Sequence, residues 1–412
     1  MNECFESIYL GIDFGTTRVK ATLIDDNEKV LNTFVISWTE AQCNKNLLSD
    51  WILILQKVVK SLIKKSGVNP DNIKCMALSC MSPCIVLIDE SSRENTSPII
   101  LYDEVISTDK FVCRLDRINA TINILRSFTP KGSNGCLKIL NASSWLLWQL
   151  TGEIAIDEYG LHDILGISKI EEIMGATFPD RILRPNSIVG SIKDFWSKYL
   201  GLPNNVQVCC GSTDTVALLR ATSLKKNGHL IYLGTFFSVL EAKESFVNGL
   251  PVGISSLPYQ WHISLEGGAF IERLASSFFP IEESRSGQIS KLLKLAEHAT
   301  SKGNANYKEI AIQEWTLNKP VQMLPLLCEF CVGETTTADL SLIPFSSFTK
   351  ALIRYIEEVN LAGDVPVIGG LSQNEWILEY IEKNVDIKCS SKSKIYGAEG
   401  AALLARDGFY EQ

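Results

Sequence analysis

The sequence lacks the features that mark several large classes of protein. No stretch approaches the ~18 uncharged apolar residues that a membrane-spanning helix needs. The opening residues, MNECFESIYLGIDFG, contain no basic region followed by an apolar core and a cleavage site of small residues. Lys and Arg form no run beyond two or three residues, and the net charge is −8. We therefore expect a cytoplasmic protein with neither a membrane nor a nucleic acid as partner.

Redox chemistry and metal binding by cysteines also find little support in the sequence. The one C-x-x-C segment, at residues 328–331, is followed by no second pair and no His ligand. The chain has 12 cysteines, too dispersed for the disulfide framework of a small secreted domain. Several lie within apolar, strand-like runs, which predicts buried free thiols: Cys75, Cys80, Cys209 and Cys210.

What is present is the composition of a globular α/β protein. Apolar residues make up 46% and charged residues 21% of a chain of 412 residues. This length suits two domains, each large enough for its own core. Near the N-terminus, two apolar runs flank the segment Asp13–Thr17 and predict a strand–turn–strand hairpin.

The tip of this hairpin is suited to phosphate binding. Gly15 lets a ligand approach the main chain, and Thr16 and Thr17 add hydroxyls beside successive backbone N–H groups. Asp13, a carboxylate beside such a cradle, makes chemical sense when a divalent cation lies between them. Taken alone, the same residues also fit an ordinary hairpin with a polar tip.

Further elements follow in order. We expect a third strand at Val30–Ser37, a helix after Asp50, a strand at Ile73–Leu78 and a loop-rich stretch over Asp157–Ser168. A helix is predicted at Ala142–Leu150, with Asn141 as its N-cap and Gly152 as its end.

A Gly-, Thr- or Ser-rich turn follows an apolar strand at four places in the chain. The turns are Asp13–Thr17, Gly211–Thr215, Gly234–Thr235 and Gly369–Asn374. Four such loops, with acidic residues in only the first two, indicate a nucleotide cleft between two domains. In GSTDT, Asp214 directly precedes a predicted helix, and an Asp in that position commonly serves as the N-cap.

These segments resemble the motifs of the FGGY family of carbohydrate kinases, in particular its short, pentulose-kinase-like branch of xylulose and D-ribulose kinases. The similar segments are GIDFGTT, VCCGSTDTVA, LGTFFSVL, GGLSQNEW and YGAEGAALLA. The resemblance implies two actin-like (ribonuclease H-like) ATPase domains of the sugar kinase, Hsp70 and actin superfamily, with a cleft between them. We place the N-terminal domain, with the first phosphate loop, the sugar-binding side and the catalytic Asp, at residues 1–226. The C-terminal domain, with the second hairpin and the adenosine motif, then covers residues 227–412.

The resemblance also implies roles for individual residues around ATP, Mg²⁺ and a small sugar or polyol. Asp214 would act as the general base and Asp13 would hold Mg²⁺, both close to the substrate. Ser82 and Glu104 would contact the sugar, although Ser82 also fits a plain turn before Pro83. The nucleotide would be bound by Gly15, Thr16, Thr17, Gly234, Thr235, Gly267, Gly369, Gly370 and Asn374.

The sequence departs from the family pattern mainly on the substrate side. Its sugar motif reads Tyr102-Asp103-Glu104, which changes the usual Asp and loses an Arg, and Leu371 replaces a Gly of the adenosine motif. Two functions therefore stay open: a kinase for a pentulose or for another polyol such as glycerol or gluconate, and a catalytically weakened nucleotide- and sugar-binding regulator. A monomer and a homodimer are both compatible with the sequence.

Overall fold

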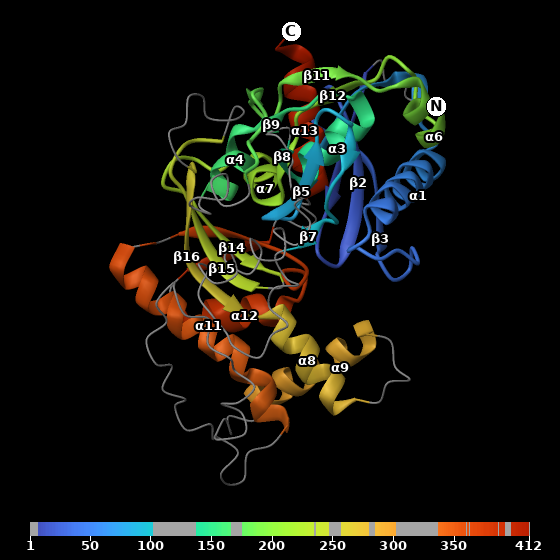
Figure 1. The fold of residues 1–412 in the computed structure, drawn as a ribbon. Coiled ribbons are helices and arrows are strands. Elements are labelled where there is room, and N and C mark those ends of the chain that lie inside the picture. Colours follow the sequence, from blue (N-terminus) through green and yellow to red (C-terminus); the bar gives the residue numbers. More distant parts are fainter. Residues whose placement is uncertain are drawn as a thin grey trace.

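The computed structural model describes residues 7–101, 137–165, 175–234, 236–246, 257–279, 285–301, 337–359, 361, 363–385, 387–391 and 397–411. Figure 1 shows an upper part built around one sheet and a lower part built around another. Within the described residues, no helix is both long and apolar enough to cross a bilayer.

The upper part is organised around a seven-stranded mixed sheet with the order β11-β12-β4-β1-β2-β3, in which β13 also pairs with β4. Strands β1, β2 and β3 form an antiparallel meander, as predicted, whereas β4 runs parallel to β1 and to β12. The strands are β1 (Ile8–Phe14), β2 (Arg18–Asp25), β3 (Val30–Ser37), β4 (Ile73–Cys80), β11 (Ile188–Ser191), β12 (Gln207–Cys209) and β13 (Ser212–Thr213).

Helices and a smaller sheet surround this central sheet. The small sheet has the order β6-β5-β7, with β8 paired to β5, and β9 pairs with β10. These strands are β5 (Cys84–Asp89), β6 (Glu94–Asn95), β7 (Ile100–Leu101), β8 (Leu137–Asn141), β9 (Ile156–Asp157) and β10 (Ile182–Leu183). The helices are α1 (Leu48–Ser66), the 3₁₀ turn η1 (Pro70–Asn72), α3 (Ala142–Thr151), α4 (Glu158–Leu165), α6 (Asp194–Leu200) and α7 (Asp214–Thr222).

The lower part is built on a five-stranded sheet with the order β16-β15-β14-β17-β18. Its strands are β14 (His229–Leu233), β15 (Phe236–Ala242), β16 (Tyr259–Glu266), β17 (Asp364–Ile368) and β18 (Lys388–Ser391). The helices of this half of the chain are α8 (Gly268–Phe278), α9 (Arg285–Ser301), α11 (Thr337–Val359), α12 (Glu375–Asn384) and α13 (Gly397–Tyr410).

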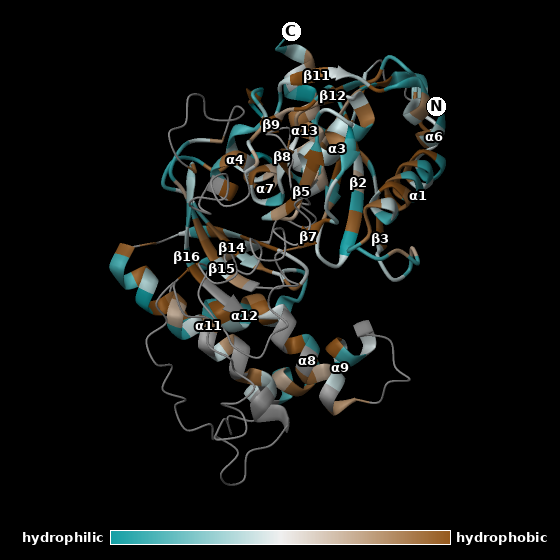
Figure 2. Ribbon diagram, viewed as in Figure 1, coloured by the Kyte–Doolittle hydropathy of each residue, from teal (hydrophilic) through white to brown (hydrophobic). Residues whose placement is uncertain are grey.

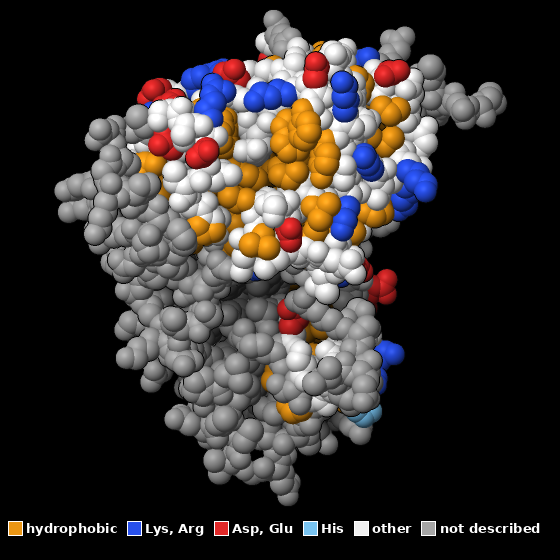
Figure 3. Space-filling model, turned by 45° about the vertical axis from the view of Figure 1, so that its right-hand side comes forward, with side chains coloured by type: hydrophobic (Ala, Val, Ile, Leu, Met, Phe, Trp, Pro, Cys, Tyr) orange, Lys and Arg blue, Asp and Glu red, His pale blue; other side chains and the backbone are white. Residues whose placement is uncertain are grey.

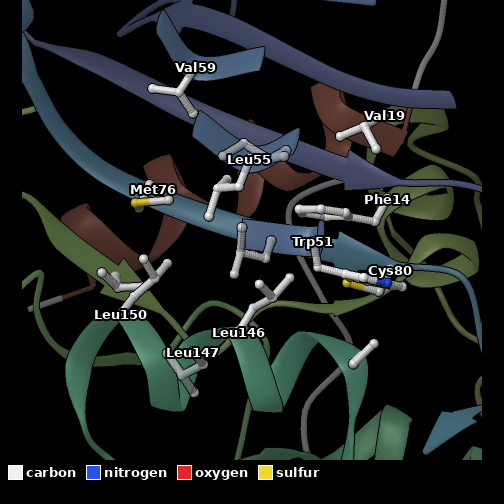
Figure 4. Close-up of a cluster of buried hydrophobic side chains, with 14 of the residues drawn as sticks. Phe14, Val19, Trp51, Leu55, Val59, Met76, Cys80, Leu146, Leu147 and Leu150 are labelled. Atoms are coloured by element: carbon white, nitrogen blue, oxygen red, sulfur yellow. The ribbon is translucent and has the colours of Figure 1, made fainter. Parts of the chain in front are cut away.

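Each part has its own apolar core. In the upper part, apolar side chains of α1 and α3 pack against the central sheet (Figures 2 and 4). Phe14, at the end of β1, stacks on Trp51 of α1 with 5.0 Å between ring centroids. The predicted thiols Cys75, Cys80, Cys209 and Cys210 are buried and free. On the face shown in Figure 3, Lys, Arg, Asp and Glu side chains all occur over the upper part.

The helix predicted at Ala142–Leu150 is confirmed, including both of its ends. Asn141 accepts a hydrogen bond from the Ser144 N–H at 2.8 Å, and Gly152 ends the helix in the left-handed region with φ of 82°. The loop-rich interpretation of Asp157–Ser168 is wrong over residues 158–165, which form α4, and residues 166–168 lie outside the described residues. The sequence around Gly160 disfavours a helix, but Asp157 accepts a hydrogen bond from the Gly160 N–H at 2.8 Å and so stabilises the first turn.

The last helix, α13, returns to the upper part and packs on β1, β4 and α7 (Figure 1). Its small residues make this approach possible. A Cβ atom on Gly400 would lie 1.7 Å from the Ala217 carbonyl oxygen of α7, and one on Gly11 of β1 would lie 2.0 Å from the Ala398 carbonyl oxygen. The division into domains at residues 226 and 227 stays a prediction, but the end of the chain completes the packing of the first sheet.

Candidate active site

Four polar residues occupy matching positions on adjacent strands of the upper sheet. Asp13 on β1 lies opposite Lys20 on β2 and Ser79 on β4, and Ser79 lies opposite Ser212 on β13. Residues at matching positions in neighbouring strands share one face of a sheet. Lys20 Nζ is 3.1 Å from Asp13 Oδ2, and Ser79 Oγ donates to Asp13 Oδ1 at 2.9 Å. The pairing therefore gathers an acid, a base and two hydroxyls from four separate segments.

The Asp13–Lys20 pair is held in a largely desolvated place. Asp13 is only 3% exposed. Burial by itself lowers the pKa of the Lys20 ammonium, but the Asp13 carboxylate, together with Tyr232 and Asp214, outweighs that effect and raises the pKa above its ordinary value. Lys20 thus stays charged, which gives the site a fixed positive charge next to the first phosphate loop.

Tyr232 brings the lower sheet into the same electrostatic environment. It lies on β14, one residue before the end of that strand. Burial raises the pKa of Tyr232 to about 12; Lys20 opposes the rise, and Asp214 and Asp13 add to it. Tyr232 of the lower sheet is therefore close enough to Asp13, Lys20 and Asp214 to influence their charges and to be influenced by them. The cleft between the two domains stays a prediction.

Asp214 is the first residue of α7, directly after β13. The interpretation of Asp214 as the N-cap is wrong, because the cap is Thr213, whose hydroxyl accepts from the Val216 N–H at 3.4 Å. Asp214 Oδ1 instead accepts from the N–H of Thr215 at 2.8 Å, which fixes the orientation of the carboxylate. The positive end of the helix dipole favours a negative charge at this position.

Aromatic side chains of the core support the first phosphate loop. The Gly15 N–H donates to the Arg18 carbonyl oxygen at 3.0 Å and closes the hairpin. The Gly15 carbonyl oxygen accepts from Trp38 Nε1 at 3.0 Å. With Phe14 stacked in the core, the half-buried Thr16 and Thr17 sit on a rigid support. This rigidity suits a loop that must hold phosphate oxygens in one position.

Three glycine loops of the lower sheet converge on the end of β14. The Gly268 N–H donates to the Gly234 carbonyl oxygen at 3.0 Å, which places the Gly267 turn beside the second hairpin. Gly369 has φ of +106°, and a Cβ atom there would lie 2.5 Å from the Leu233 carbonyl oxygen. Only glycine permits this approach. Thr235, the other predicted residue of the hairpin, lies outside the described residues.

The adenosine motif shows how the chain accommodates its departure from the family pattern. Leu371 is partly buried against the core of the lower part, so its side chain packs inward. A Cβ atom on Gly370 would have no neighbour within 4 Å, which leaves open space beside the backbone there. Asn374 caps α12 by accepting from the Ile377 N–H at 3.3 Å. Asn374 therefore has a structural role, and its contact with adenosine stays a prediction.

Of the two predicted sugar contacts, only Ser82 belongs to the described part of the chain. The neighbouring Met81 N–H donates to the Phe14 carbonyl oxygen at 2.9 Å, so the turn that holds Ser82 adjoins the first phosphate loop. This position fits a substrate beside the phosphates. Glu104 lies outside the described residues.

The residues present fit Mg²⁺ bound together with a nucleotide. Among the residues that the structure describes, no group of three or more His, Cys, Asp and Glu side chains is arranged to hold a metal ion. Mg²⁺ commonly uses one or two carboxylates together with substrate phosphates and water rather than an all-protein cage. Asp13, adjacent to the phosphate loop and supplying hard oxygen ligands, meets that requirement.

Sequence reasoning missed Lys20, although the signal for it was present. A tight hairpin with its tip at residues 15–17 pairs Phe14 with Val19 and therefore Asp13 with Lys20. A lysine in an otherwise apolar strand, opposite a candidate acid, marks a functional position. Tyr232 had no comparable signal, because its place in the site depends on how the two sheets face each other.

Comparisons with known proteins agree with this architecture. No family model matches the chain. A probable L-xylulose kinase of Pasteurella multocida is 24% identical over 307 residues, which span 65% of this chain and 62% of that protein. A ligand-bound xylulose kinase of Lactobacillus acidophilus superposes with a TM-score of 0.67 at 15% identity, covering 98% of this chain and 90% of the other. Plasmodium falciparum glycerol kinase with ADP gives a TM-score of 0.66 at 14% identity, covering 100% and 91%. These likenesses bear out the resemblance to the FGGY carbohydrate kinases, and the chain has the two-domain, actin-like fold of the sugar kinases.

Proposed function

We propose that this protein is an ATP-dependent carbohydrate kinase that transfers the γ-phosphate of ATP to a hydroxyl of a pentulose such as D-ribulose or xylulose. One observation carries the proposal. Asp13 and Lys20 of the upper sheet, and Asp214 at the start of α7, interact electrostatically with Tyr232 of the lower sheet, next to the glycine loops. A charged cleft of this composition suits phosphoryl transfer, which depends on positioning and on stabilising charge at the phosphates.

Asp214 is the proposed general base. As the sugar oxygen forms its bond to the γ-phosphorus, the bond from that phosphorus to the β–γ bridging oxygen breaks and ADP leaves. The proton of the sugar hydroxyl passes to the Asp214 carboxylate, which its hydrogen bond from Thr215 holds in one orientation. An Asp is a weak base at neutral pH, but deprotonation comes late in a loose transition state, so orientation matters more than basicity.

Lys20 and Asp13 are the proposed phosphate-side pair. Lys20 supplies positive charge near the β- and γ-phosphates, and the N–H groups and hydroxyls of Gly15, Thr16 and Thr17 bind their oxygens. Asp13 would hold Mg²⁺, which when bound neutralises charge on the transferred phosphoryl group. The Ser79 hydrogen bond keeps the Asp13 carboxylate in place before any ligand binds.

The identity of the acceptor is proposed on the names of the relatives. Two of the proteins similar to this chain are named for L-xylulose and xylulose, and a third is named for glycerol. The sequence segments of the pentulose branch favour a five-carbon ketose over glycerol or gluconate. Ser82, beside the phosphate loop, is the proposed contact with the sugar. The cytoplasmic location and the monomeric or homodimeric state stay predictions.

A substrate screen with a matched control tests the proposal. Purified protein with Mg-ATP is offered D-ribulose, D- and L-xylulose, L-ribulose, glycerol and D-gluconate, and ADP formation is followed. For the accepted sugar we expect Asp214→Ala to lower kcat at least ~100-fold, the usual effect of losing a general base. Asp194→Ala is the control, because Asp194 is likewise the first residue of a helix but lies on the exposed α6.

The alternative, a catalytically weakened regulator, makes a different prediction. It requires nucleotide binding, measured by calorimetry, without any sugar raising ADP formation above the Asp214→Ala level. The inward packing of Leu371 removes one reason for favouring it, since that side chain lies against the core. Turnover with any of the sugars that Asp214→Ala abolishes would exclude this alternative.

A further inference from the structure

A buried carboxylate next to the site has no part in the proposed mechanism. Asp157, at the junction of β9 and α4, is 0% exposed. Its Oδ1 atom accepts from Ser212 Oγ at 2.7 Å and from the Gly160 N–H at 2.8 Å. Its Oδ2 atom accepts from Asn141 Nδ2 at 3.3 Å. An isolated carboxylate is costly to bury, so a fully buried one that is retained needs such a set of donors.

The hydrogen bond to Ser212 connects Asp157 to the segment that carries Asp214. Ser212 and Thr213 form β13, Thr213 caps α7, and Asp214 follows as the first helical residue. The turn just before is fixed as well, since Gly211 has φ of +74° and a Cβ atom there would lie 2.3 Å from the Leu78 carbonyl oxygen. Any shift of Ser212 therefore moves the carboxylate two residues later.

Ser212 also lies beside the residue that holds the Asp13 carboxylate. Ser212 lies opposite Ser79 on β4, and Ser79 donates to Asp13. Asp157 thus holds one end of a row of polar residues whose other end is the Asp13–Lys20 pair. The residues around Asp157 are tightly packed. A Cβ atom on Gly160 would lie 2.2 Å from Asn141 Nδ2 and 2.4 Å from Asp157 Oδ2.

We propose that Asp157 is a positioning residue for phosphoryl transfer: through Ser212 it sets the place and orientation of Asp214. The proposal rests on the proposed function, since it assigns Asp157 a task in that reaction. Asp157 touches neither substrate nor nucleotide in this arrangement. A misplacement of a reacting group by about 1 Å can cost ~100-fold in rate, so a bond that fixes a catalytic turn can matter without contact to substrate.

A double-mutant cycle tests whether Asp157 acts through Ser212. Asp157→Ala, Ser212→Ala and the double variant are compared with the natural protein for kcat and for KM of ATP and sugar. We expect each single variant to lower kcat by about tenfold or more, with KM for ATP changed by less than about twofold. The double variant should be no slower than the slower single variant, because both changes remove the same bond.

A matched control separates this role from a general loss of stability. Asp25 is also buried, at 5% exposure, and its Oδ1 atom accepts two backbone N–H bonds in the turn after β2. Asp25→Ala should leave kcat unchanged even where it lowers the melting temperature. Should Asp157→Ala fail to fold, Ser212→Ala, which removes only a hydroxyl, still measures the same bond.

Amide hydrogen exchange distinguishes failure of this proposal from failure of the proposed function. In Asp157→Ala and Ser212→Ala, the amides of residues 211–216 should exchange at least about tenfold faster, whereas Asp25→Ala should leave them unchanged. A natural protein that forms no ADP with any sugar overturns the function, and unchanged exchange then overturns the positioning role separately. With an active enzyme, an unaltered kcat in folded variants overturns the proposal. Losses in kcat that are additive in the double variant also overturn the proposal.

Discussion

Replacing Lys20 by Met should destabilise the upper part of the protein far more than removing any exposed lysine. Met preserves most of the length of the side chain but removes the charge. Asp13 would then be a buried carboxylate, 3% exposed, that keeps the Ser79 hydroxyl as a donor but has lost its cationic partner. Leaving one member of a buried ion pair without its partner costs about 3–5 kcal/mol. We expect the lower end, ~3 kcal/mol, because the Lys20 side chain is 25% exposed and water reaches part of it.

The pH dependence of this contribution follows from the sign of the Lys20 shift. The pKa of Lys20 is raised in the folded protein, so the folded state binds its proton more tightly than the unfolded chain does. The stabilisation is therefore complete below the unfolded pKa of 10.5 and is lost only as the pH rises through the higher folded value. Between about pH 6 and pH 9 the effect of Lys20→Met should accordingly stay constant.

Urea unfolding of the whole chain measures the effect, with two variants for comparison. Lys226→Met is the control, because Lys226 is 60% exposed and only 3.5 Å from Glu244, a pair expected to contribute less than ~1 kcal/mol. Adding Asp13→Asn to Lys20→Met should recover much of the lost stability by removing the unpaired charge. If Lys20→Met costs no more than Lys226→Met, or if Asp13→Asn brings no recovery, the pair does not stabilise the fold as described.

Two further predictions concern stability. Burial raises the pKa of Asp157 to about 6 from the ordinary value of 3.8, so its favourable contribution is complete below that ordinary value and is lost as the pH rises through about 6. The unfolding free energy of the natural protein relative to Asp157→Asn should fall by ~3 kcal/mol between about pH 3.5 and 7, and a flat difference would contradict this. Gly400→Ala should cost ~2 kcal/mol or more in thermal unfolding, because its Cβ would lie 1.7 Å from the Ala217 carbonyl oxygen of α7. Gly190→Ala, whose Cβ would meet nothing closer than 3.8 Å, is the control, and equal costs would refute the close packing of α13.

The parts of the site that the sequence predicted are those encoded by short segments. Asp13 directly follows an apolar run and Asp214 follows another after the short turn Gly211–Thr213, and strand ends of a sheet fall at one edge, so the order of residues alone predicts that the two carboxylates lie near each other. The helix after Asn141 was predicted from equally local signals, because Asn141 caps its start and Gly152 ends it. In each case, the residues that suggested the prediction and the residues that determine the local structure belong to the same short segment.

The parts that it missed depend on contacts between distant segments. α4 forms despite Gly160, because Asp157 accepts a hydrogen bond from the Gly160 N–H, and Asn141 and Asp157 leave no room for a side chain at that position. Propensity alone cannot reveal such an override, because the tertiary neighbours supply the missing stabilisation. In the sequence, Asp157 is one acidic residue of a predicted loop. Its connection to the site becomes evident only from its hydrogen bond with Ser212, 55 residues later.

The position of α13 explains why the site needs both ends of the chain. Asp13 lies on β1, and Asp214 begins α7; α13 packs on both elements. A Cβ atom on Gly397, its first residue, would lie 2.7 Å from Asp13 Cγ, so the start of this helix closes over the carboxylate. Since β18, the described element that precedes α13, belongs to the lower sheet, the same helix connects that sheet to β1 and α7 of the upper part (Figure 1). The geometry that brings Tyr232 toward Asp13 is therefore fixed partly by the last helix, and the two halves of the site are not independent units.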